Sequence, residues 1–254
     1  MNTYEGLHAR HYDLIYADKP YEREAQFVAE LLGRRSGTLL DLACGTGRHA
    51  LAFARIGFEV TGVDYGDELL ERARRNAAEA GERIEFELGD MRTVELGRRF
   101  DAVTCLFDSI GYPLSDEGVV AALSTARNHL EPEGALAVEF LHAPAALARS
   151  SPTRVRRWPT PEGGRLVRIS ETEIDPPTSR MSVAYELFEL EPDGAGYATG
   201  ANVQENRFFT VPEMEGLLHS AGLSTERFVA AYEQEPEITD ETWHVLALAR
   251  RDSR

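Results

Sequence analysis

Two glycines, Gly45 and Gly47, follow residues 39–44, a mostly apolar segment that is typical of a buried strand. A backbone that must turn sharply and approach a ligand closely needs glycine at such positions. The next strand-like run, residues 58–63, ends on Asp64, whose carboxylate can bind both hydroxyls of a ribose. Together these residues predict a site for a cofactor that contains adenosine.

Two classes of cofactor fit this pattern. The spacing Gly45-x-Gly47-x-x-Ala50, with Asp64 nineteen residues beyond Gly45, satisfies the fingerprint of dinucleotide-binding proteins. The same residues also satisfy the pattern for S-adenosylmethionine, abbreviated AdoMet below. The glycine turn alone therefore leaves both alternatives open.

Composition limits the class of protein. The chain has 254 residues, of which 43% are hydrophobic, enough for one large α/β domain with an inserted subdomain. It contains no apolar run of about 18 residues that could cross a membrane, and its N-terminus lacks the basic and apolar segments of a signal peptide. Cys44 and Cys105 each end a predicted buried strand, which favours reduced core thiols. We therefore expect a cytoplasmic protein with no membrane partner.

Charge limits the partners. The formal net charge is −16 and the isoelectric point is about 4.9. Because such a surface repels nucleic-acid backbones, we expect a small-molecule substrate and no nucleic-acid partner. The densest basic run, residues 154–158, is short and typical of a solvated edge, although it could touch a phosphate-bearing small substrate. Lys19 is the only lysine, which excludes mechanisms that need a lysine later in the chain.

Strand and helix patterns, which must position these residues, alternate along the first 150 residues. Helix patterns at 3–18 and 21–33 come first. The later patterns are strands at 38–43, 58–63, 84–88, 100–106 and 134–141, and helices at 47–56, 67–80 and 115–130. Such alternation predicts a parallel, doubly wound sheet with helices on both faces.

The alternation ends near residue 150. Three strand-like runs, 165–175, 180–190 and 197–209, are typical of an antiparallel meander, and the chain closes with a helix at 211–221 and strands at 223–231 and 242–250. We therefore expect a cofactor-binding domain of residues 1–150 and 210–254, in which residues 1–34 form a helical cover. Residues 151–209 would form an inserted antiparallel substrate subdomain.

Acidic side chains gather where the predicted strands end, which is where open α/β sheets bind their ligands. The residues expected at this rim are Asp41, Asp64, Asp90, Asp108 and Glu139. AdoMet carries a sulfonium and an ammonium but no phosphate, so an acidic rim favours it over a pyrophosphate. The catalytic Tyr-x-x-x-Lys pair of many nicotinamide enzymes of this size is also missing, since the chain has no lysine after Lys19.

Four motifs occur in order and at one family's spacing: Asp41-x-Ala43-x-Gly45-x-Gly47, Gly62-x-Asp64, Gly89-Asp90-Met91, and Phe100-Asp101-Ala102-Val103 running into Leu106. With them the chain resembles class I AdoMet-dependent methyltransferases over essentially its whole length. Within that family it is most similar to bacterial small-molecule N-methyltransferases, including the N,N-dimethyltransferases of nucleotide-linked amino sugars.

This resemblance implies a fold and an activity. The fold is a Rossmann-like, seven-stranded, mostly parallel sheet with helices on both faces, N-terminal helices and an inserted antiparallel β-meander. The activity is transfer of a methyl group from AdoMet to a small-molecule acceptor, with an amine as the leading candidate. Methylation of oxygen or carbon, a nicotinamide-dependent oxidoreductase and a cofactor-binding protein without catalysis are the alternatives.

The resemblance also implies a cofactor site. The glycine turn would pass beneath the methionine part, Asp64 would bind the ribose, and Asp90 would bind the adenine. The implied cofactor-binding residues are Tyr21, Ala43, Gly45, Gly47, Asp64, Tyr65, Asp90, Met91 and Leu106.

Four residues are candidates for orienting the acceptor and taking its proton: Tyr12, Asp108, Glu139 and His142. His142 is the best placed of the histidines because it follows a strand end. The methyl donor is already activated, so proximity and alignment supply most of the catalysis and a dedicated base is not required. The spacing of the acidic residues gives no metal site. The oligomeric state is left open, with a homodimer as one alternative.

Overall fold

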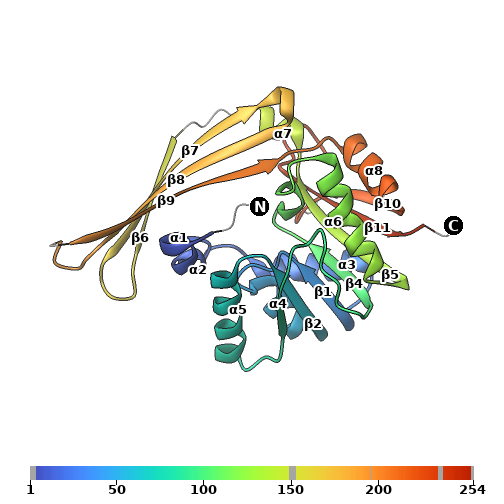
Figure 1. The fold of residues 1–254 in the computed structure, drawn as a ribbon, viewed down its shortest axis with the longest axis horizontal. Helices are drawn as coiled ribbons and strands as arrows, with labels where there is room; N and C mark the ends of the chain where they lie inside the picture. Colours follow the sequence, from blue (N-terminus) through green and yellow to red (C-terminus); the bar gives the residue numbers. More distant parts are fainter. Residues whose placement is uncertain (1–3, 149–152, 195, 234–236, 253–254) are drawn as a thin grey trace.

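A computed structural model describes residues 4–148, 153–194, 196–233 and 237–252 (Figure 1). The chain forms two sheets, one of seven strands and one of four. The predicted domain boundary between residues 150 and 151, and the first residue of the predicted helix at 3–18, lie outside the described residues. No helix in the described parts of the chain is long and apolar enough to cross a membrane.

The large sheet has the predicted Rossmann-like topology, with the strand order β10-β11-β5-β4-β1-β2-β3. Its strands are β1 (Gly37–Leu42), β2 (Phe58–Asp64), β3 (Glu85–Leu88), β4 (Phe100–Cys105), β5 (Leu130–Leu141), β10 (Leu223–Ala230) and β11 (His244–Arg251). β11 pairs antiparallel with both β5 and β10, and the other pairings are parallel. The prediction of a mostly parallel, seven-stranded sheet is confirmed.

Helices cover both faces of this sheet, because apolar residues on the buried strands point to each face in turn. Leu39 of β1 packs in one core cluster, with α3, α4 and α5. Leu40 packs in the other, with α6 and α8. The helices are α3 (Tyr21–Leu32), α4 (Arg48–Ile56), α5 (Asp67–Ala80), α6 (Asp116–Asn128) and α8 (Val211–Ser220).

The strand register sets the position of the site. Asp41 of β1 lies opposite Gly62 of β2 and Thr104 of β4. The carboxyl ends of the three central strands therefore meet at one edge, where the loops that follow them are brought together.

The N-terminal segment differs from the prediction of one helix over 3–18. It forms two short helices, α1 (Gly6–Arg10) and α2 (Tyr12–Ile15), with His11 between them at φ −100° and ψ 12°. Leu7 and Ile15 pack against Leu166 and Leu187 of the second sheet. These helices therefore lie against the small sheet, while Tyr12 contacts Leu69 of α5.

The second sheet is an antiparallel meander in the order β6-β7-β8-β9 (Figure 1). Its strands are β6 (Thr153–Pro159), β7 (Arg165–Asp175), β8 (Arg180–Leu190) and β9 (Tyr197–Arg207). Three of these were predicted, whereas β6 and the short helix α7 (Ala143–Ala148) were missed. The meander enters and leaves the main body at one place, where Phe209 N–H donates to Leu141 O (2.9 Å) and Ala143 N–H donates to Phe209 O (2.8 Å).

Candidate active site

The turn after β1 combines three left-handed residues within five positions: Ala43 (φ 58°), Gly45 (φ 56°) and Gly47 (φ 73°). A Cβ atom at Gly45 would meet nothing within 4 Å, so this glycine faces open space. A Cβ atom at Gly47 would lie 2.9 Å from Cζ of Phe86 and 3.1 Å from Cβ of Ala73. Gly45 can therefore receive a ligand, while Gly47 is required for packing.

A pocket opens beside this turn, between the carboxyl ends of β1, β2 and β4 and the N-terminal segment; we call it the main pocket. Several residues predicted to bind the cofactor line it: Tyr21, Ala43, Gly45, Asp64, Tyr65, Met91 and Leu106. Tyr12, predicted as a catalytic candidate, lines it as well. Gly47 and Asp90 are not part of this lining, and their role in cofactor binding stays a prediction.

Asp64 joins the end of β2 to the glycine turn. Its Oδ2 accepts a hydrogen bond from Gly45 N–H (2.7 Å), and its Oδ1 accepts one from Gly66 N–H (2.8 Å). Burial raises the pKa of this carboxyl above its usual value, although the backbone donors act in the opposite direction. Both oxygens keep further acceptor capacity toward the main pocket, which suits a ligand with neighbouring hydroxyls.

Asp41 lines the main pocket, and one of its carboxylate oxygens has no hydrogen-bond partner. It is 2% exposed, its Oδ1 accepts from the Thr104 hydroxyl (2.8 Å), and its Oδ2 has no hydrogen-bond partner. Burial raises the pKa of Asp41 to about 6, and the neighbouring charge of Asp64 adds to this. A buried carboxylate oxygen without a partner is costly, and a cationic ligand group would supply one. The lining thus fits the ammonium of AdoMet better than a pyrophosphate.

Asp90 lies beside the main pocket rather than in it. Its carboxylate forms a two-pronged pair with the Arg92 guanidinium (3.0 and 2.5 Å) and accepts from Arg92 N–H (2.9 Å). These bonds lower the pKa of Asp90. It lines a second hollow that shares Tyr4, Tyr65 and Gly89 with the main pocket. A ligand that extends past Gly89 would reach it.

Arg48 and His49 are among the pocket residues that were not predicted from the sequence. Arg48 and His49 open α4 directly after the glycine turn and line the main pocket. The Arg48 guanidinium lies 5.6 Å from the Tyr21 ring centroid, and His49 Nε2 lies 2.7 Å from Glu24 Oε2. Their position on the first turn of a helix that follows a glycine turn was the available signal.

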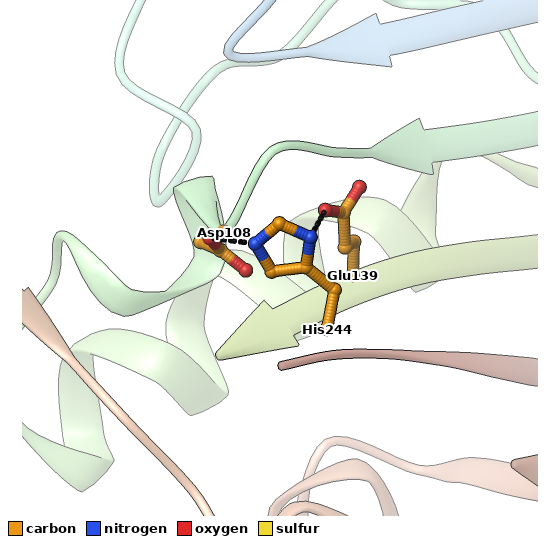
Figure 2. Close-up of side chains that lie close together, drawn as sticks. All are labelled: Asp108, Glu139 and His244. Carbon is orange, nitrogen blue, oxygen red and sulfur yellow. Dashed lines mark ion pairs between the residues drawn. The ribbon is translucent and has the colours of Figure 1, made fainter. Parts of the chain in front are cut away.

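The three other catalytic candidates are absent from the lining of the main pocket. Glu139 is fully buried, and its Oε2 accepts from Phe107 N–H (2.9 Å) and from the Tyr232 hydroxyl (2.5 Å). Figure 2 shows the carboxylates of Glu139 and Asp108 on opposite sides of the His244 imidazole. In this structure protein groups surround the Glu139 carboxylate, and its contact with an acceptor stays a prediction.

His142 is also placed away from the main pocket. Its Nδ1 lies 3.2 Å from Thr242 O, and burial lowers its pKa. Its side chain contacts the segment before β11 because residue 142 is at the point where the meander leaves the large sheet. His244, which was not selected from the sequence, lies between Asp108 and Glu139 instead.

Comparison with known proteins identifies the family of the chain. Residues 39–134 match a family model described as a methyltransferase domain. The chain is 34% identical over 230 residues to the dTDP-3-amino-3,4,6-trideoxy-alpha-D-glucopyranose N,N-dimethyltransferase of Streptomyces venezuelae, covering 88% of this chain and 92% of that protein.

Solved structures give the same result. The structure of DesVI from Streptomyces venezuelae is 27% identical with a TM-score of 0.77, covering 96% of this chain and 99% of that one. The structure of SAM-bound CalS10, an amino pentose methyltransferase from Micromonospora echinaspora, is 25% identical with a TM-score of 0.73, covering 99% of both chains.

The choice between a dinucleotide and AdoMet, left open by the glycine turn, is resolved by the sequence likeness, the fold and the unpartnered Asp41 in the pocket. The cofactor is AdoMet, and the nicotinamide alternative is set aside. The chain belongs to the family of S-adenosylmethionine-dependent methyltransferases.

Proposed function

We propose that this enzyme methylates an amine on a small, sugar-like acceptor. The observation that carries the proposal is the 34% identity to an N,N-dimethyltransferase of a dTDP-linked amino sugar. That likeness covers 88% of the chain, so it extends well beyond the 39–134 segment matched by the methyltransferase model. CalS10, similar over its whole length, is described as an amino pentose methyltransferase.

We assign the main pocket to the cofactor. Asp64 would hold the ribose hydroxyls, Gly45 would let the backbone approach, and Asp41 would face the ammonium. Met91 and Leu106 would enclose the adenine. The remaining predicted cofactor residues, with Asp90 at the adjoining hollow, complete the site. When bound, AdoMet supplies an activated methyl group on a sulfonium.

Tyrosines from the N-terminal segment face the place where the acceptor must enter. Tyr4 and Tyr12 line the main pocket together with Ser109 and Tyr112. Burial raises the pKa of Tyr12 well above its usual value, so it stays a phenol at neutral pH. Tyr12 would therefore orient the acceptor through a hydrogen bond, and the rate would come from alignment rather than from a strong base.

The remaining expectations form part of the same proposal. Residues 1–34 would cover the cofactor within a domain of residues 1–150 and 210–254, and residues 151–209 would contribute to the acceptor site. A net charge of −16 supports a small acceptor over nucleic acid. We further propose that the enzyme works in the cytoplasm, and that a homodimer is one arrangement to test by solution mass.

The test is a matched pair of acceptors. The enzyme is incubated with AdoMet and a dTDP-linked 3-amino sugar, and in parallel with the corresponding sugar that carries a hydroxyl in place of the amine. Mass spectrometry should show a gain of one or two methyl groups on the amino sugar only. Methylation of the hydroxyl sugar, or of neither compound while AdoMet binds normally, would refute the amine acceptor.

A further inference from the structure

Asp108, Glu139 and His244 form a cluster of side chains that lie close together (Figure 2), and Asp108 is next in sequence to Phe107 and Ser109 of the main pocket. His244 opens β11, and because that strand is antiparallel to β5 its first residue lies at the carboxyl edge, opposite Leu141. His244 Nε2 lies 3.2 Å from Asp108 Oδ2, and His244 Nδ1 lies 3.4 Å from Glu139 Oε1. One imidazole thus connects the ends of three strands.

The segment that this cluster contacts is strained. Phe107 (φ 56°) and Asp108 (φ 59°) are consecutive non-glycine residues in the left-handed region. Such a conformation persists only where several interactions fix it. Phe107 N–H donates to Glu139 Oε2 (2.9 Å), Asn206 Nδ2 donates to Asp108 O (3.1 Å), and the Asp108 carboxylate pairs with His244.

The strained segment shapes the main pocket directly. Leu106, Phe107 and Ser109 all line it, whereas the Asp108 side chain between them points back to His244. A change in the contact between Asp108 and His244 would therefore move the pocket wall without removing any group that touches the ligand.

The two ring nitrogens of His244 face different carboxylates, so one protonated ring forms an ion pair with both. One atom from each of the three residues could also be offered to an ion, which is the competing interpretation that metal binding tests. Glu139 Oε2 is also occupied by Phe107 N–H and the Tyr232 hydroxyl. Burial and Lys19 lower the pKa of His244, but Asp108 and Glu139 outweigh them and raise it to about 9.

We propose that the His244 imidazolium is a positioning residue that ties Asp108 to Glu139 and so holds the strained segment of Phe107 and Asp108 in the shape that binds AdoMet. Loss of its proton leaves the buried carboxylate of Glu139 and the partly buried carboxylate of Asp108 with no cation between them. The segment then relaxes and the pocket wall moves. This inference depends on the cofactor site alone and not on the identity of the acceptor.

The test measures nucleoside binding as a function of pH. Methylthioadenosine is the probe, because it has no amino or carboxyl group to titrate between about pH 7 and pH 10. Calorimetry compares the wild type with His244→Gln, and His219→Gln is the matched control because His219 is exposed on α8. In parallel, nuclear magnetic resonance of ring-labelled histidine follows the ionisation of His244 in the wild type.

We expect the wild type and His219→Gln to lose roughly fivefold or more in affinity as the pH rises through 9. His244→Gln should bind weakly at every pH, with no such loss. A wild-type affinity that is flat over this range would overturn the proposal, even if His244→Gln failed to fold. Stoichiometric binding of Zn²⁺ or Mn²⁺ to the wild type but not to His244→Gln would also overturn it, in favour of a metal site.

Discussion

The carboxylate of Asp13 accepts a hydrogen bond of 2.6 Å from the hydroxyl of Thr46. Asp13 belongs to α2 and Thr46 to the glycine turn, so this bond joins the N-terminal segment, the proposed cover, to the glycine turn. The other oxygen of Asp13 accepts from Arg72 Nε (2.9 Å) and Asn76 Nδ2 (2.8 Å), both on α5. One side chain therefore fastens the cover to two elements of the main body.

Replacing Asp13 with Ala should loosen this cover. Thr46 and Asn76 are buried, and leaving them without their acceptor costs about 1–3 kcal/mol. We expect a lower melting temperature and AdoMet binding weakened by about tenfold. Asp18→Ala is the control, because Asp18 is exposed on the same segment. Equal effects of the two substitutions would show that the bond to Thr46 has no role in binding.

Replacing Asp64 with Ala should weaken AdoMet binding by roughly ten- to a hundredfold. The variant loses the acceptors for the ribose and also those for Gly45 N–H and Gly66 N–H, each worth about 1.5–3 kcal/mol as hydrogen bonds to a charged group. Calorimetry with AdoMet measures the loss, and Glu71→Gln on the exposed face of α5 serves as the control. An unchanged affinity would refute the ribose role.

Substitution by alanine should have different effects at the two glycines of the turn: lower stability at Gly47 and weaker AdoMet binding at Gly45. Gly47→Ala places a methyl group against Phe86 and should cost about 1–3 kcal/mol of stability. Gly45→Ala meets no protein atom, so its stability cost should be limited to the left-handed backbone, about 1 kcal/mol, while its methyl group faces the ligand. Denaturant titration and AdoMet calorimetry on both variants separate the two effects. If Gly47→Ala lost more AdoMet affinity than Gly45→Ala, and Gly45→Ala lost more stability, the result would show that Gly47, not Gly45, lies beneath the cofactor.

Asp41 should give AdoMet binding a dependence on pH. Its pKa is raised to about 6, so without ligand its contribution to stability is complete below its unfolded pKa and is lost as the pH rises through about 6. The ionised form is the one that attracts a cation, so AdoMet affinity should rise over the same range. Asp41→Asn should bind weakly with a flat profile between about pH 5 and pH 7. A persistent rise in this variant would assign the dependence to another group.

Much of the fold was predictable because its central strands carry strong local patterns. The apolar runs before Asp41 and Asp64 specify buried parallel strands whatever surrounds them. β6 was missed for the opposite reason. Most of its residues are exposed, including Arg154, Arg156 and Arg157, so its extended form comes from pairing with β7 and not from an apolar period.

The site was predictable only as far as strand ends could be located. Strand-end reasoning brought Asp108 and Glu139 to the correct edge, but it could not give the direction of their side chains. His244 comes more than a hundred residues after Glu139 and reaches the site through an antiparallel strand. Its place beside Glu139 therefore could not be predicted from the spacing of nearby residues. The different roles of Gly45 and Gly47 likewise depend on Phe86, which lies on another strand.

The narrow connection between the two sheets bears on how such enzymes diversify. The meander departs after Leu141 and returns at Phe209, and backbone hydrogen bonds fasten the two points to each other. The tips of the meander strands can therefore change in length while the pairing of β5 with β11 keeps its register. On the proposal that residues 151–209 contribute to the acceptor site, exchange of these strands is a route by which selection could change the acceptor, provided that the contacts of Leu166 and Leu187 with the N-terminal helices are kept.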